Sequence, residues 1–159
     1  MTNSLQRQLA NWLNHPIEAQ APPMSDFDSL CDQVQSNDIL LVAGRTRIAA
    51  IIGRITQSTW SHAMLYIGPL NQIEDSELRQ MIQAHYHGSP STPLVIESLL
   101  GYGTIISPLS SYREEHLRIC RPRGLSQADG NQILQQVCSH LGKPYNVSHI
   151  IALMFLLMP

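Results

Sequence analysis

Five short segments of strand length, separated by polar stretches rich in glycine and proline, constrain the fold of this chain more than any other feature. The first, Ile39–Ala43, is a continuous apolar run that ends at Gly44, and such a run is typical of a buried strand. The others cover residues 61–67, 94–98, 101–106 and 117–121. Stretches with helical spacing lie between and around them. We therefore predict an α+β fold in which helices pack against a small, mostly antiparallel sheet.

The remaining stretches divide the chain into two parts. Helical spacing and helix-end residues predict helices over residues 1–14, 26–36, 45–55, part of 71–86, 126–141 and 146–159. Proline pairs mark residues 15–25 as a linker. We therefore predict an N-terminal helical extension and linker over residues 1–36, followed by one domain over residues 37–159.

Charge and composition argue against several function classes. Ten basic residues face twelve acidic ones, which gives no reason to expect a nucleic-acid partner. The longest apolar run, Ile150 to Met158, is too short to span a bilayer, which takes about 20 helical residues. The three cysteines are not closely spaced, so we expect a reducing compartment, the cytoplasm. His85 and His87 lie two residues apart in a loop, but no cysteine or acid accompanies them at metal-ligand spacing, so we predict no metal and no cofactor.

His62 opens the second predicted strand, within the sequence QSTWSHAMLYIG. Strand alternation places His62, Met64 and Tyr66 on one face of the sheet. A histidine at a strand end can present one ring nitrogen to a thiol and the other to a carboxylate, as thiol catalysis requires. The alternative is a partly buried histidine that is hydrogen-bonded to the backbone.

Glu97 follows three apolar residues on the third predicted strand, in the sequence LVIESL. A carboxylate on a core strand is costly unless it is paired, and it could orient the imidazole of His62 as the third group of a triad does. The alternative is a glutamate at the end of a strand that reaches solvent. Each residue supplies the partner that the other requires.

The order of these elements resembles a known family. Asp38 precedes the first apolar strand, and QSTWSHAMLY, VIES, the Pro108-Leu109 pair, LRICRP and LGKPYN follow in turn. This order resembles the circularly permuted NlpC/P60 papain-like cysteine hydrolases, specifically the YiiX/YebB-like or "lipo-like" branch, most firmly over residues 37–149. The resemblance implies a permuted papain-like fold in which His62 is the general base and Glu97 its orienting partner. It also implies that Trp60, Ser61 and Tyr145 border the cleft.

In the family, the cysteine nucleophile opens a helix downstream of the element that Tyr145 and Asn146 match. No cysteine follows Cys138 here. Cys138 lies on the apolar side of a predicted helix, where packing is the usual role, and neither Cys31 nor Cys120 matches the family nucleophile. We therefore expect the nucleophile beyond residue 159, a domain incomplete at its C-terminus, and a chain that alone is inactive.

Two functions remain open. The first is a cysteine hydrolase, either an amidase or peptidase or an acyl-ester hydrolase or acyltransferase, and the resemblance implies peptide or lipid-like acyl substrates. The second is a non-catalytic binding domain that keeps the scaffold and the cleft. The predicted helix over residues 147–158 is apolar nearly all round, so we also expect a longer natural product or self-association through this helix.

Overall fold

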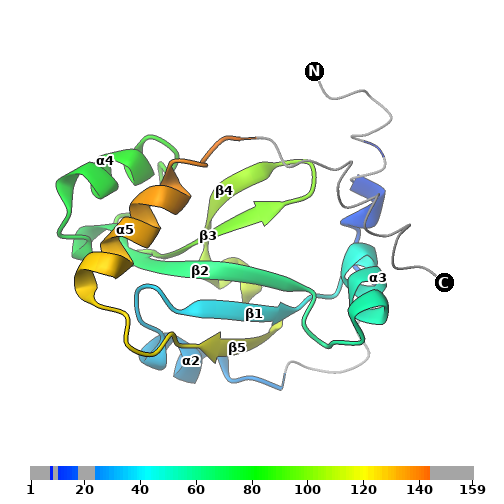
Figure 1. The fold of residues 1–159 in the computed structure, drawn as a ribbon. Coiled ribbons are helices and arrows are strands. Elements are labelled where there is room, and N and C mark those ends of the chain that lie inside the picture. Colours follow the sequence, from blue (N-terminus) through cyan, green and yellow to red (C-terminus); the bar gives the residue numbers. More distant parts are fainter. Residues whose placement is uncertain (1–7, 9–10, 18–23, 144–159) are drawn as a thin grey trace.

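The computed structural model describes residues 8, 11–17 and 24–143, which include a five-stranded sheet (Figure 1). The strands are β1 (Ile39–Ala43), β2 (His62–Pro69), β3 (Pro93–Leu99), β4 (Gly103–Pro108) and β5 (His116–Cys120). Their order across the sheet is β4-β3-β2-β1-β5, and each neighbouring pair is antiparallel. The predicted α+β fold with a small antiparallel sheet is confirmed.

Within residues 24–143, four helices and two short 3-10 segments surround the sheet. They are α2 (Phe27–Gln33), α3 (Arg47–Thr56), α4 (Ser76–Gln83), α5 (Gln127–Cys138), η1 (Leu70–Gln72) and η2 (Leu109–Tyr112). The side chains of Asp26, Thr46, Asp75 and Ser126 cap the N-termini of the four helices. None of the helices in the described ranges is long and apolar enough to cross a bilayer. Tyr145 and the predicted 147–158 helix lie outside the described residues.

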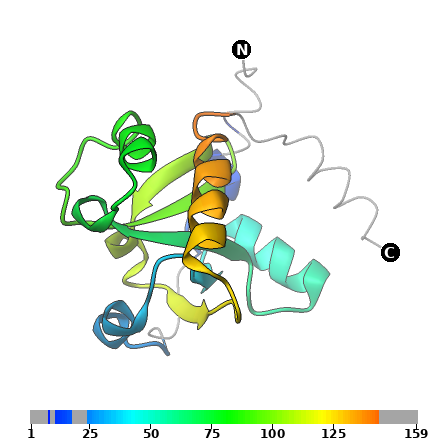
Figure 2. The same cartoon turned by 60° about the vertical axis from the view of Figure 1, so that its left-hand side comes forward.

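Each face of the sheet carries its own apolar core. The two views in Figures 1 and 2 show the helices around the sheet. On one face, α4 and α5 bury residues that include Ile67, Leu94 and Ile96 of the sheet. On the other face, α2 and η2 pack against Leu40, Val42, Met64, Tyr66 and Val95. The alternation of β2 between the two cores therefore agrees with the predicted faces, and His62 shares the α2 face with Met64 and Tyr66.

Helix α3 stands at the end of the sheet where β1 finishes and β2 begins (Figure 1). The turn into it is tight, since a Cβ on Gly44 would lie 3.1 Å from the Cβ of Ala49 and 3.2 Å from Oγ of Ser61. The backbone N–H of Gly44 donates to Oγ of Ser61 at 3.0 Å. Glycine at position 44 therefore lets α3 begin directly beside the first residues of β2.

Residues that we assigned to the N-terminal extension pack within the domain. Phe27 and Leu30 of α2 are buried in the core of the α2 face. Pro16, from the predicted linker, forms an antiparallel bridge with Thr46, and the N–H of Ile17 donates to the carbonyl of Arg45 at 2.7 Å. The sequence does not reveal these contacts because they join segments about thirty residues apart and follow no periodicity.

Asp38, which is buried, joins β5 to the turn before β1. Its carboxylate accepts hydrogen bonds from Nε and Nη2 of Arg121 at 2.8 and 2.7 Å and from the N–H of Gln35 at 2.8 Å. We expect Asp38→Ala to lower the free energy of unfolding by about 2–3 kcal/mol, because it removes charge-assisted bonds and leaves the Gln35 N–H without its acceptor. Urea titration measures the change.

The matched control is Asp28→Ala, which removes a carboxylate that pairs with Arg113 at the surface. This exposed pair contributes little to stability. Equal effects of the two substitutions would show that Asp38 is not a structural link.

Candidate active site

His62 and Glu97 meet on the α2 face of the sheet, at the end that carries α3. The Nε2 atom of His62 lies 2.8 Å from Oε2 of Glu97. In the antiparallel register of β2 and β3, Tyr66 pairs with Val95, so Glu97 falls opposite Met64 and diagonal to His62 on the same face. Diagonal neighbours are within reach of long side chains, which explains why the two residues touch.

The carboxyl group of Glu97 is buried and anionic. Only 3% of the residue is exposed. Burial raises the pKa of Glu97, but the hydrogen bond to His62, with smaller contributions from Ser107 and Tyr112, outweighs burial and leaves the pKa below its usual value. The alternative of a glutamate that reaches solvent is therefore wrong.

Tyr112, the last residue of η2, is a third member of this group. Its hydroxyl donates to Oε2 of Glu97, the same oxygen that His62 contacts. The Tyr112 and His62 rings are stacked with their centroids 6.4 Å apart. Burial, followed by the hydrogen bond to Glu97, raises the pKa of Tyr112 well above its usual value, so the hydroxyl remains a donor. No pattern in the sequence had pointed to Tyr112 as a site residue.

The anionic carboxylate decides which nitrogen of neutral His62 carries the proton. A carboxylate accepts hydrogen bonds and donates none, so Nε2 is the N–H donor and Nδ1 carries the lone pair. Within the described part of the chain, Nδ1 has no hydrogen-bond partner. His62 therefore offers a basic nitrogen that is oriented by Glu97 and free to take a proton.

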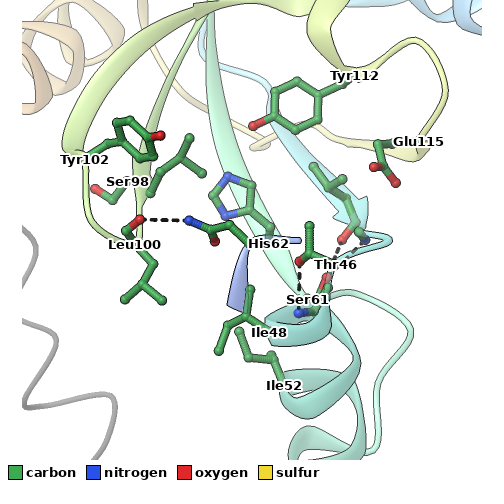
Figure 3. Close-up of a pocket in the computed structure, with 15 residues that line it drawn as sticks. Thr46, Ile48, Ile52, Ser61, His62, Ser98, Leu100, Tyr102, Tyr112 and Glu115 are labelled. Carbon is green, nitrogen blue, oxygen red and sulfur yellow. Dashed lines mark hydrogen bonds between the residues drawn. The ribbon is translucent and has the colours of Figure 1, made fainter. Parts of the chain in front are cut away.

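A cleft of about 380 Å³ lies beside His62, between α3 and the β3–β4 turn (Figure 3). Its volume is within the range of small-molecule sites. Six aliphatic side chains contribute to its walls: Val42, Ile48, Ala49, Ile52, Leu99 and Leu100. Asn14 reaches it from the N-terminal segment, where its side-chain amide donates to the carbonyl of Leu100 at 3.0 Å. The arrangement combines a general base with an apolar binding surface.

The other residues that we expected at the cleft have different positions. Ser61 lines the cleft and also accepts the Gly44 N–H. Trp60 stacks on His116 with the ring centroids 5.2 Å apart and is not among the residues that line the cleft. Tyr145 falls outside the described residues.

The three cysteines lie away from His62. Cys138 is in the core on the opposite face of the sheet, and burial raises its pKa to about 11. Cys120 pairs with Ile39, whereas His62 pairs with Val42, so the two project from opposite faces and are about 10 Å apart along the strand direction alone. Cys31 packs in α2, where burial, followed by Asp28, raises its pKa.

No cluster of three histidine, cysteine, aspartate or glutamate side chains that could bind a metal ion is present in the described ranges. The chemistry that the described residues offer is proton transfer at Nδ1 of His62, next to a surface that can bind an acyl group.

Comparison with known protein families gives a match over most of the chain. The model of a family of permuted papain-like amidase enzymes, YaeF/YiiX, C92 family, matches residues 33–152, which is more than half of the chain. No curated protein sequence matches the chain. The matched region includes all five strands, His62, Glu97 and Tyr112. The chain therefore belongs to the permuted papain-like amidase family.

Proposed function

We propose that this chain carries the general base and its orienting carboxylate for a cysteine hydrolase of the NlpC/P60 superfamily, in the YiiX/YebB-like branch. The substrate is an amide or ester of a peptide or of a lipid-like acyl group. The observation that carries the proposal is the contact of His62 with the buried Glu97, beside an apolar cleft. Family membership supports hydrolysis through a thiol.

The reaction proceeds in two steps. In the first, Nδ1 of His62 takes the proton of a cysteine thiol, and the thiolate attacks the substrate carbonyl. The imidazolium then protonates the leaving amine or alcohol, and a thioester remains. In the second step, His62 takes a proton from water, which attacks the thioester and releases the acid and the free thiol. Glu97 stabilises the imidazolium in both steps, and Tyr112 orients Glu97.

The nucleophile in this proposal is a cysteine encoded beyond residue 159. Cys138 of α5 lies in the core on the sheet face opposite His62, and Cys120 projects from that same face. Cys31 is near Tyr66, four residues along β2 from His62, which is about 13 Å. None of the three sulfurs can therefore exchange a proton with Nδ1 of His62 in this fold.

Labelling with a thiol-reactive acyl probe tests the proposal. We expect a protein extended through the coding sequence that follows codon 159 to be labelled on a new cysteine that opens a helix. In the native 159-residue chain we expect only slow labelling, since Cys138 is buried and Cys31 and Cys120 are half-buried. After denaturation we expect all three cysteines to be labelled rapidly. Mass spectrometry of the digested protein identifies the labelled residue. His62-dependent labelling of one of these three cysteines would refute the external nucleophile.

The second candidate function is a binding domain without catalysis. It is favoured by the observation that the cleft and the His62–Glu97 pair are formed without any of the chain's own cysteines. Two results together would favour the binding domain: a stop codon directly after codon 159, and a protein that binds ligands but is not labelled by the acyl probe. For either function we propose a cytoplasmic location, where the three unpaired cysteines remain reduced.

A further inference from the structure

The walls of the cleft are built from aliphatic side chains of three separate elements. Val42 comes from β1, Ile48 and Ile52 come from α3, and Leu99 and Leu100 come from the end of β3 and the turn that follows. In Figure 3, Ile48 and Ile52 lie below the His62 ring and Leu100 lies on the other side of the opening. A ligand that enters the cleft therefore meets apolar surface on both sides before it reaches His62.

The serine and threonine side chains of the cleft already have partners within the protein. Oγ1 of Thr46 accepts the Ala49 N–H at 3.3 Å, Oγ of Ser61 accepts the Gly44 N–H at 3.0 Å, and Oγ of Ser98 lies 3.0 Å from Oγ1 of Thr104. The carboxylate of Glu115 faces Nε of Arg45 at 3.8 Å. The three hydroxyl groups serve the fold, so they are poorly placed to pair with the amides of a peptide.

The arrangement of the cleft determines whether a peptide or an aliphatic acyl group binds more tightly. A buried amide without a partner costs about tenfold to a hundredfold in affinity. A methylene that leaves water for an apolar wall gains about fourfold. We propose, on the basis of the function proposed above, that the acyl group of the substrate is an unbranched aliphatic chain. The chain lies between α3 and the β3–β4 turn and its carbonyl lies at His62.

Binding by the 159-residue chain tests this inference without any thiol chemistry. The probes are the N-methyl amides of butanoic, hexanoic, octanoic and decanoic acids, with acetyl-alanyl-alanine N-methylamide as the peptide probe. Calorimetry is expected to show Kd falling by about fourfold for each added methylene until the cleft is full. Over the butanoyl to octanoyl range the gain is on the order of a hundredfold. The peptide probe is expected to bind no more tightly than the butanoyl amide.

Two tryptophan substitutions on α3 locate the binding site. Ile52→Trp fills the cleft and is expected to abolish the dependence on chain length, whereas Ile51→Trp, one residue away and outside the lining, is expected to keep it. If Ile52→Trp unfolds α3, Ile52→Ala replaces it as the test. This smaller substitution is expected to weaken binding of the octanoyl amide several-fold. Circular dichroism checks that each variant is folded.

Three results would overturn the inference: affinity that does not depend on chain length, tighter binding of the peptide probe, or equal effects of the substitutions at positions 51 and 52. Its failure is distinguishable from failure of the proposed function. Chain-length dependence without probe labelling of the extended protein leaves the aliphatic site standing and removes the hydrolase. Probe labelling of the extended protein without chain-length dependence leaves the hydrolase standing and removes the aliphatic site.

Discussion

Replacing His62 with alanine is expected to slow acyl-probe labelling of the extended protein by about a thousandfold. The imidazole is the only described ionisable group that combines an oriented carboxylate partner with a free basic nitrogen at the cleft. General-base assistance of this kind contributes about a hundredfold to ten-thousandfold in rate. The loss is expected in the rate constant at saturating probe, because the apolar walls that bind the acyl chain are unchanged.

The matched control is His140→Ala, which removes an exposed imidazole at the C-terminal end of α5. This substitution is expected to leave the labelling rate unchanged. Addition of free imidazole should partly restore the His62→Ala protein, since the deleted ring leaves a space beside Glu97. A His62→Ala protein that is folded and labels at the wild-type rate would remove His62 from the mechanism.

The position of the His62–Glu97 pair could be predicted because it depends on local patterns. The apolar run Ile39–Ala43 coincides with β1, and the alternation along β2 places His62 on the face observed. The polarity of Glu97 within an apolar strand indicated a buried partner. The two side chains can then meet if the neighbouring strands β2 and β3 present them on the same face of the sheet, which their register does.

The strand β4 was predicted two residues too early. We expected it over residues 101–106, and it covers Gly103–Pro108. Gly101 lies in the turn with a φ of +87°, and Gly103, with a φ of +80°, is the residue at which the strand begins. Glycine spacing shows that a turn is present, but not which residues take the left-handed conformation.

Tyr112 and the wall of the cleft could not be predicted, for a different reason. Tyr112 follows β4 in a short 3-10 segment, and only the tertiary fold brings its hydroxyl to Glu97. Asn14 reaches Leu100 across 86 positions of sequence. Neither contact leaves a periodic signal, since each depends on a loop path. The Pro108-Leu109 element of the family resemblance was the nearest indication that this segment borders the site.

Replacing Glu97 with glutamine is expected to slow labelling of the extended protein by about a hundredfold or more. The amide can still accept a hydrogen bond from Nε2 of His62, but it cannot stabilise the imidazolium by charge. Tyr112→Phe is expected to have a smaller effect, about tenfold, since Glu97 keeps its contact with His62. A larger loss in Tyr112→Phe than in Glu97→Gln would contradict the order of roles proposed here.

Glu97→Gln is also expected to change how the free energy of unfolding of the 159-residue chain depends on pH. Contacts with His62, Ser107 and Tyr112 leave the pKa of Glu97 below its unfolded value of 4.5 despite burial. A carboxyl group whose pKa is lowered on folding stabilises the protein above the unfolded pKa, and this contribution is lost as the pH falls through the folded pKa. The stability gap between the wild type and Glu97→Gln is therefore expected to narrow as the pH falls below 4.5.

Urea unfolding at intervals from pH 7 to pH 3 measures this gap. Glu74→Gln, at an exposed glutamate, is the matched control, and its curve is expected to run parallel to that of the wild type. A gap for Glu97→Gln that widens below pH 4.5 would mean that the carboxyl group folds in its protonated form. In that case Glu97 could not stabilise the imidazolium of His62, and the pair would be a structural hydrogen bond.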